Sequence, residues 1–100
     1  MPRLIQPTEA AIADFDRIYD FLSKRNPRAA ANILRKLDAA IQRLADQPKL
    51  GRAYAPSRGR LRVLEHEGYL VFYREIPGII QIIRVIHGRQ NVPDILDELN

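Results

Sequence analysis

The spacing of apolar residues along this chain changes once, near residue 61, from a helical period to a strand period. Before that point apolar residues recur every three or four positions; after it they alternate or run together in stretches rich in β-branched and aromatic side chains. A chain that places its helices before most of its strands is expected to pack them as two layers. The sequence therefore predicts an α+β fold.

The first helix is expected to begin after Thr8, a residue type suited to the N-cap, and to end near residues 23–25. One face is apolar, and we expect Asp14 and the other charged residues of the helix on the opposite face. The apolar face comprises Ala11, Ile12, Phe15, Ile18, Tyr19 and Leu22.

A second helix is expected to begin at Asn26-Pro27, with asparagine as N-cap and proline in the first turn, and to end before Pro48. Its apolar face comprises Ala30, Ile33, Leu34, Leu37, Ile41 and Leu44. Because few residues separate the two helices, they should form an antiparallel hairpin.

Strands are expected at residues 4–6, 62–66, 69–74 and 79–87, with a loop at 48–60 and a short helical turn at 94–99. Turns are expected at Glu67-Gly68 and at Pro77-Gly78, the latter with a looser connection or a bulge. The order β-α-α-β-β-β predicts a two-layer α+β domain, with an N-terminal α-helix hairpin packed on a small antiparallel β-sheet.

The last expected strand is apolar on both faces, but the helix hairpin can cover only one face of the sheet. An uncovered apolar face would indicate a protein partner. The alternative is that the chain termini and the loop at 48–60 fold over it.

A chain of 100 residues corresponds to one domain, residues 1–100. No apolar run exceeds five residues, so we expect no membrane span and no membrane partner. The first residues contain no apolar signal core, which favours a cytoplasmic protein. With no cysteine and with His66 and His87 far apart, we expect no disulfide, metal or other cofactor.

Positive charge is concentrated in residues 47–64, which contain five cations and no acid, although the whole chain has a net charge of only +4. The five are Lys49, Arg52, Arg58, Arg60 and Arg62. This pattern indicates either an anionic partner, such as nucleic acid or an acidic protein surface, or a solvated loop.

One reaction that needs neither metal nor thiol is RNA cleavage by the 2′-hydroxyl, which requires a base, an acid and cations around the phosphate. Arg62, Arg84 and His87 lie on or at the end of expected strands. The alternative is that the strand arginines pair with acids such as Glu65, Glu67 or Glu75. Tyr69 and Tyr73 share one strand face, where they either stack on bases or, more commonly, pack in the core.

Several motifs, spread over almost the full length, resemble one known family. They are residues 14–22, Asn26-Pro27, Gly51-Arg52, residues 69–74 and residues 82–90 (Ile-Ile-Arg-Val-Ile-His-Gly-Arg-Gln). In these motifs the chain resembles the ParE/RelE superfamily of toxins from bacterial type II toxin–antitoxin systems, in particular the ParE branch, which includes plasmid stabilisation proteins.

The resemblance implies a toxin that a cognate ParD-like antitoxin neutralises, with operator DNA bound only through the antitoxin. ParE-like members inhibit DNA gyrase without catalysis, whereas RelE-like members cut mRNA in the ribosome. Ribosome-dependent nucleases tend to have an arginine just before Leu70, where this chain has Tyr69. This difference favours the ParE reading.

Three hypotheses follow. A gyrase-binding toxin would have no catalytic residue and would contact its target through Lys49, Arg52, Arg58, Arg60 and Arg62. A RelE-like nuclease would use Arg62, Arg84 and His87. A plain nucleic-acid-binding module would use the same five basic residues as the gyrase-binding toxin. For the antitoxin, the expected contact residues are Ile12, Phe15, Tyr19, Leu37, Ile41 and Tyr69.

Overall fold

Helices α1 (Glu9–Ser23) and α2 (Pro27–Arg43) form the hairpin expected from the sequence. The side chain of Thr8 accepts a hydrogen bond from the backbone N–H of Ala11 (3.1 Å), and Asn26 caps the second helix in the same manner. These caps use backbone N–H groups that have no partner within the helix. The structure is a computed structural model that describes residues 2–88, so the turn expected at 94–99 lies outside the described residues.

Five strands form one mixed sheet in the order β1-β5-β4-β3-β2. Their bounds are β1 (Leu4–Pro7), β2 (Arg52–Ala53), β3 (Arg62–His66), β4 (Tyr69–Ile76) and β5 (Ile79–His87). Strands β3, β4 and β5 lie where the alternating pattern predicted them. Strand β2 and a short 3-10 helix η1 (Ala55–Ser57) lie within the segment expected to be a loop.

The expectation that all strands are antiparallel is wrong for β1, which pairs in parallel with β5 from Leu4↔Ile79 to Pro7↔Ile82. A helix hairpin connects β1 to the rest of the sheet, so no tight turn forces it to run antiparallel. Thr8 extends the pairing, because its backbone N–H donates to the Ile82 carbonyl (3.0 Å) and its hydroxyl donates to the Ile83 carbonyl (2.9 Å). The start of α1 is thereby fixed to the middle of β5.

Strands β4 and β5 are joined by a two-residue turn at Pro77-Gly78, with Ile76 opposite Ile79, so the looser connection expected there is wrong. Gly78 has a φ of +75°, a conformation that side chains other than glycine rarely adopt. The bulge occurs instead far from the turn, where the register shifts by one residue between Phe72 and Tyr73.

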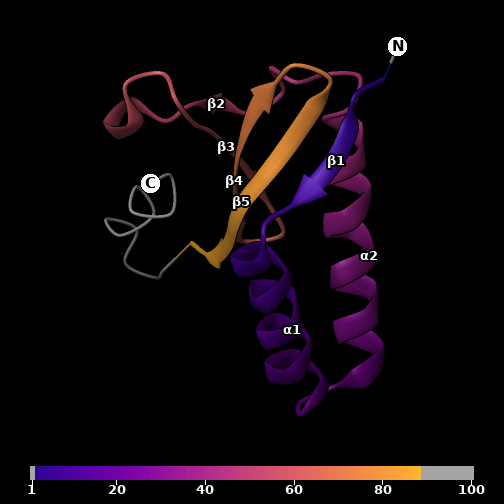
Figure 1. The fold of residues 1–100 in the computed structure, drawn as a ribbon. Helices are drawn as coiled ribbons and strands as arrows, with labels where there is room; N and C mark the ends of the chain where they lie inside the picture. Colours follow the sequence, from indigo (N-terminus) through magenta and orange to yellow (C-terminus); the bar gives the residue numbers. More distant parts are fainter. Residues whose placement is uncertain (1, 89–100) are drawn as a thin grey trace.

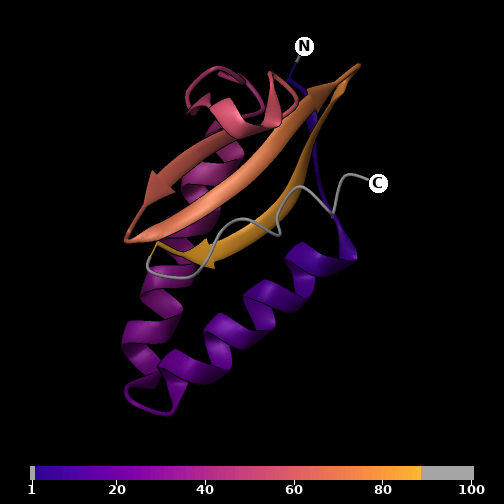
Figure 2. The same ribbon diagram turned by 90° about the vertical axis from the view of Figure 1, so that its left-hand side faces the viewer.

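The two helices cover one face of the sheet (Figures 1 and 2), and the main core lies between the layers. Residues buried there come from both helices and from the two central strands. They are Ala11, Leu37, Ile41, Leu44, Tyr69, Val71, Tyr73, Ile80, Ile82 and Val85. The aromatic side chains of β4 on this face therefore pack in the core, as the more common interpretation predicted, and are not exposed for stacking on bases.

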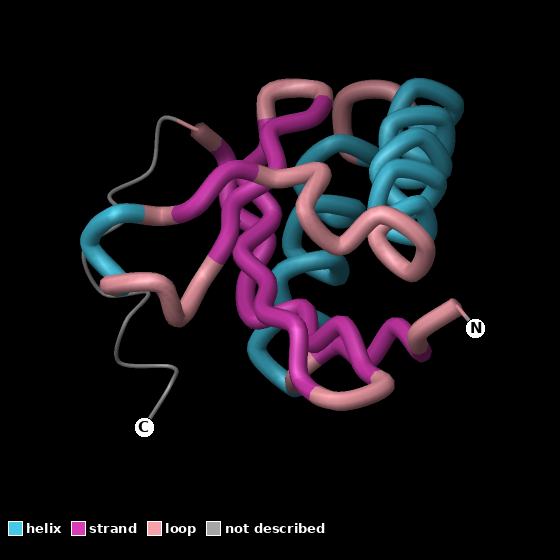
Figure 3. Tube along the Cα trace, turned by 90° about the horizontal axis from the view of Figure 1, so that it is seen from above, coloured by secondary structure: helices cyan, strands magenta, loops and turns pink. Residues whose placement is uncertain are grey.

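The opposite face is not open, which corrects the expectation of an uncovered apolar face. A second buried cluster lies there, and the loop containing η1 folds over it on the side of the sheet away from the helices (Figure 3). Tyr54 packs edge-on against Phe72, with ring centroids 5.1 Å apart, and Phe72 is only 1% exposed. The cluster comprises Leu61, Val63, Phe72, Ile83 and Ile86.

Neither helix among residues 2–88 has the length and hydrophobicity that a membrane span requires.

Candidate functional site

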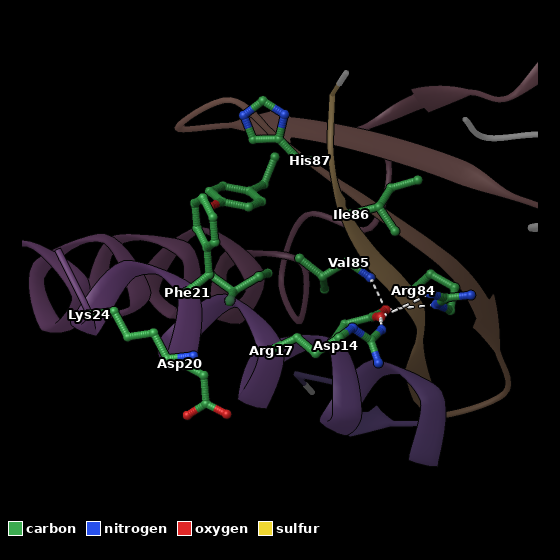
Figure 4. Close-up of a pocket in the computed structure, with 11 residues that line it drawn as sticks. Asp14, Arg17, Asp20, Phe21, Lys24, Arg84, Val85, Ile86 and His87 are labelled. Carbon is green, nitrogen blue, oxygen red and sulfur yellow. Dashed lines mark hydrogen bonds and ion pairs between the residues drawn. The ribbon is translucent and has the colours of Figure 1, made fainter. Parts of the chain in front are cut away.

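A cavity of about 590 Å³ lies between α1 and the end of β5 (Figure 4). Apolar side chains from α1, β4 and β5 form much of its wall, namely Ile18, Phe21, Tyr69, Val85 and Ile86. Charged side chains of α1 and Arg84 of β5 line the remainder, together with His87. A cavity of this composition suits a peptide or side chain that is mainly apolar with a polar margin.

The charged end of the cavity is organised around Asp14, whose carboxylate is 2% exposed. Arg84 donates to it from Nε (2.7 Å) and Nη2 (2.9 Å), the backbone N–H of Val85 donates at 2.9 Å, and Arg17 also donates to it. A buried carboxylate is tolerated when such donors replace its water. The expectation that Asp14 lies on the solvent side of α1 is therefore wrong.

A signal for this placement exists in the sequence. Asp14 follows buried Ala11 by three positions and precedes Ile18 by four, so it lies on the same helical face as both residues. A carboxylate within an apolar helical face indicates a buried ion pair if a cation from another element of the fold lies beside it. That partner, Arg84, is 70 residues away in the chain, and the periodicity alone did not identify it.

The structure brings together two of the three residues expected for a nuclease. Arg84 and His87 line the same cavity, and His87 packs edge-on against Tyr69 with ring centroids 5.4 Å apart. Arg62 lies on β3, two strands away in the sheet, and its Nη1 donates to the Gly51 carbonyl (2.7 Å). Within residues 2–88 no three side chains of the His, Asp and Glu types gather as metal ligands.

Strand arginines do find partners, but not the acids expected from the sequence. Arg84 pairs with Asp14, and Arg74 donates to the side-chain oxygen of Gln81 (2.7 Å). The acids pair elsewhere, as Glu75 lies 2.6 Å from Arg3 and Glu67 lies 3.8 Å from Lys36.

Four of the five predicted target-binding cations are exposed, namely Lys49, Arg52, Arg58 and Arg60. Arg62 is half-buried. Because Arg62 and buried Val63 are neighbours on β3, their side chains point to opposite faces of the sheet, and Arg52, opposite Val63, shares the face of the η1 loop. The structure thus separates Arg62 from the other strand arginine of the set.

Tyr73 fixes the base of this loop, a role that the sequence did not reveal. Its hydroxyl donates to the Pro48 carbonyl (2.7 Å) and accepts from the Gly51 N–H (2.9 Å). Burial raises the pKa of Tyr73 above its ordinary value of 10.0, and the Gly51 N–H and Arg62 partly oppose the rise. A Cβ added to Gly51 would lie 2.8 Å from the Tyr73 ring and hydroxyl, so only glycine fits this approach.

The predicted antitoxin-contact residues fall into two groups. Leu37 and Ile41 are 0% and 3% exposed and pack in this chain's own core, so they offer no surface to a partner in this conformation. Tyr69, 7% exposed, also packs in the core but forms part of the cavity wall. Ile12 and Tyr19 are 50% and 42% exposed on α1. Phe15, the sixth, is half-buried.

Sequence reasoning did not select Phe21, although its side chain is 54% exposed at the cavity and Arg25 stacks on its ring at 4.5 Å. A large aromatic outside the apolar face of α1 was the available signal.

Comparison with known proteins agrees with this architecture. The family described as "ParE toxin of type II toxin-antitoxin system, parDE" matches residues 5–92. Toxin ParE1 of Mycobacterium tuberculosis is 36% identical over 85 residues, covering 83% of this chain and 87% of the relative. Toxin RelE1 of Caulobacter vibrioides is 32% identical over 76 residues, covering 75% and 82%.

A solved structure titled "Chromosomal ParDE TA system from P. aeruginosa" has the same fold, with a TM-score of 0.72 at 23% identity over 85% of this chain and 95% of that chain. The resemblance inferred from the motifs is therefore confirmed by sequence and by fold. The chain belongs to the ParE toxin family of type II toxin–antitoxin systems.

Proposed function

We propose that this toxin acts in the cytoplasm by binding DNA gyrase and blocking it, without a catalytic residue, and that a ParD-like antitoxin neutralises it. Membership of the ParE family supports this function. The structural observation that supports this function best is the ion pair between Arg84 and Asp14. A nuclease would need the Arg84 cation at this cavity to bind phosphate, but here it is paired with the Asp14 carboxylate.

Cleavage by the 2′-hydroxyl requires cations that bind the phosphate more tightly as its charge develops. Arg84 donates from two nitrogens to a carboxylate that is almost fully buried, so a phosphate would have to displace an existing ion pair. Tyr69, at the position where nucleases of the superfamily tend to have arginine, is buried and uncharged. These contacts favour a binding toxin.

The test is a supercoiling assay with purified gyrase, relaxed plasmid and the full chain. We expect supercoiling to stop when toxin is added at a stoichiometric excess, and to resume when the antitoxin encoded beside the toxin gene is added first. The variant Arg84→Gln, with its fold checked by circular dichroism, should inhibit as well as the original chain. Undiminished supercoiling at excess toxin would contradict this target.

A second function, ribosome-dependent mRNA cleavage, is favoured by one observation: Arg84 and His87 line a common cavity. A relative named RelE1 is also among the similar proteins. Primer extension on transcripts after induction distinguishes the two functions. New 5′ ends that disappear in the His87→Ala variant would support the nuclease, whereas intact transcripts together with arrested supercoiling would exclude it.

For the antitoxin, we propose contact with the exposed apolar residues of α1 and with the adjoining cavity. Ile12 and Tyr19 lie seven positions apart and therefore share one side of the helix. Phe21 lies at the cavity itself. An amphipathic segment with apolar anchors fits such a surface.

A further inference from the structure

The η1 loop (residues 52–60) lies on the side of the sheet opposite the helices (Figures 1 and 3) and contains three arginines. Arg52, Arg58 and Arg60 are all exposed. Within the described part of the chain, none of the three forms an ion pair, and residues 47–64 contain no acid. Their charges are therefore not compensated by neighbours on the loop.

The loop is held in one conformation from within. The Ser57 side chain is buried, donates to the Tyr54 carbonyl (2.6 Å) and accepts from the Leu61 N–H (2.9 Å). Arg60 donates from Nε to the Ser57 carbonyl (3.0 Å). A loop ordered before binding loses less entropy when it meets a partner.

The large apolar residues in the loop and directly after it point inward, and this limits the kind of partner that the loop can bind. Tyr54 and Leu61 pack in the second core cluster. The exposed residues between the arginines are small, namely Ala53, Ala55, Pro56 and Gly59. Protein interfaces depend on aromatic and aliphatic anchors at their centre, which this surface lacks. Interfaces with nucleic acid are polar and strongly positive, which this surface is.

We infer that the η1 loop binds the sugar–phosphate backbone of duplex DNA through Arg52, Arg58 and Arg60, independently of base sequence. Arginine suits phosphate because its planar guanidinium donates two parallel hydrogen bonds. The inference is distinct from operator recognition by an antitoxin. It rests on the proposed function only in choosing DNA, the substrate of the proposed target, over an RNA duplex.

Fluorescence anisotropy with the full chain and a labelled DNA duplex of arbitrary sequence tests this inference. Three phosphate contacts predict that log K falls with log salt concentration with a slope of about −2.7, or about 40-fold weaker binding between about 50 and 200 mM salt. The variant Arg52→Gln/Arg58→Gln should reduce the slope to about −0.9. Arg28→Gln/Arg35→Gln, which removes the same charge from exposed positions on α2, should leave the slope unchanged.

Three outcomes would overturn the inference: no binding to DNA at low salt, equal loss in the loop and α2 variants, or equal competition by polyglutamate, which would indicate an acidic protein partner. An RNA duplex bound more tightly than DNA would overturn the choice of nucleic acid. The measurement contains no gyrase, so its failure is separate from failure of the supercoiling assay.

Discussion

At the level of single residues, Asp14 is the clearest example of a polar group whose partners explain its position. One carboxylate accepts hydrogen bonds from α1, from the side chain of Arg84 and from the backbone of β5 at Val85. Strand β1 pairs with β5 only as far as Ile82, so the Val85 N–H has no strand beside it on that edge. The Asp14 carboxylate accepts its hydrogen bond in place of a carbonyl from a further strand. The ion pair fixes the helix to the sheet at the cavity.

Replacing Asp14 by alanine should therefore destabilise the fold. Removing one partner of a buried ion pair costs about 3–5 kcal/mol, and we expect about 3 kcal/mol here because the Arg84 side chain retains solvent contact. Urea unfolding followed by circular dichroism measures the change. Asp16→Ala, an exposed position on the same helix, is the matched control and should change the free energy of unfolding little. Equal stability of the two variants would contradict the structural role of Asp14.

Tyr73 gives a second prediction, on pH. Because burial raises the pKa of Tyr73 in the folded state, the unfolded chain loses this proton first as the pH rises. The unfolded state then binds fewer protons, so stability is full below about pH 10 and falls as the pH rises above that value. Tyr73→Phe should flatten part of this decline above about pH 10.

At neutral pH the same Tyr73→Phe variant should be less stable by about 1–3 kcal/mol, since the buried N–H of Gly51 loses its acceptor. Tyr19→Phe, which removes a hydroxyl from an exposed position of α1, is the control and should change the free energy of unfolding little. An unchanged pH profile in Tyr73→Phe would assign the alkaline loss to Tyr69, whose pKa burial also raises.

Among the elements, those set by local pattern were predictable and those set by distant contacts were not. The caps at Thr8 and Asn26 and the strands β3 to β5 follow from residue types and spacing over a few positions. The parallel pairing of β1 with β5 joins segments about 75 residues apart, and the residues of β1 carry no information about direction. The Asp14–Arg84 pair was missed for the same reason.

The η1 loop was partly predictable. Its charge is evident in the sequence, but its role in covering the second core depends on Tyr54 and Leu61, two apolar residues in a basic segment. The sequence leaves two alternatives, an open sheet face or a face covered by this loop, and the packing of Tyr54 on Phe72 shows that the loop covers it. The same loop thus exposes its arginines to solvent on one side and covers the second buried cluster on the other.

Docking of this loop should depend on Gly51. In Gly51→Ala the added Cβ would meet both Tyr73 and the Val63 carbonyl at 2.8 Å, so the base of the loop must shift. Such overpacking costs about 1–3 kcal/mol. Hydrogen exchange should show faster exchange of the Tyr54 and Leu61 amides than in the original chain, and Ala53→Ser, at an exposed site nearby, should not. Unchanged exchange in Gly51→Ala would contradict the role of this close approach.

For the whole molecule, the two proposed surfaces lie on different parts of the fold. The exposed apolar residues and the cavity belong to α1 and the end of β5, whereas the basic loop projects from the sheet face away from the helices (Figures 1 and 3). The cavity is bounded by the buried pair of Asp14 and Arg84, and the loop by the contacts of Tyr73 and Ser57. Substitutions on one surface should therefore not affect the other.

A charge placed at Phe21 tests this separation. Phe21 is half exposed at the cavity, so Phe21→Asp should leave the fold intact while placing a carboxylate where an apolar anchor of the antitoxin would bind. Loss of an aromatic anchor costs about 2 kcal/mol, which corresponds to about 30-fold weaker binding. Titration calorimetry with the antitoxin encoded beside the toxin gene measures this loss of affinity. The anisotropy assay with DNA on the same variant should give an unchanged salt slope.

The conservative variant Phe21→Leu is the control and should bind the antitoxin within a few-fold of the original chain. Antitoxin binding that is equally tight in Phe21→Asp would place the contact elsewhere on the toxin, and a parallel loss of DNA binding would show that the two surfaces are not independent.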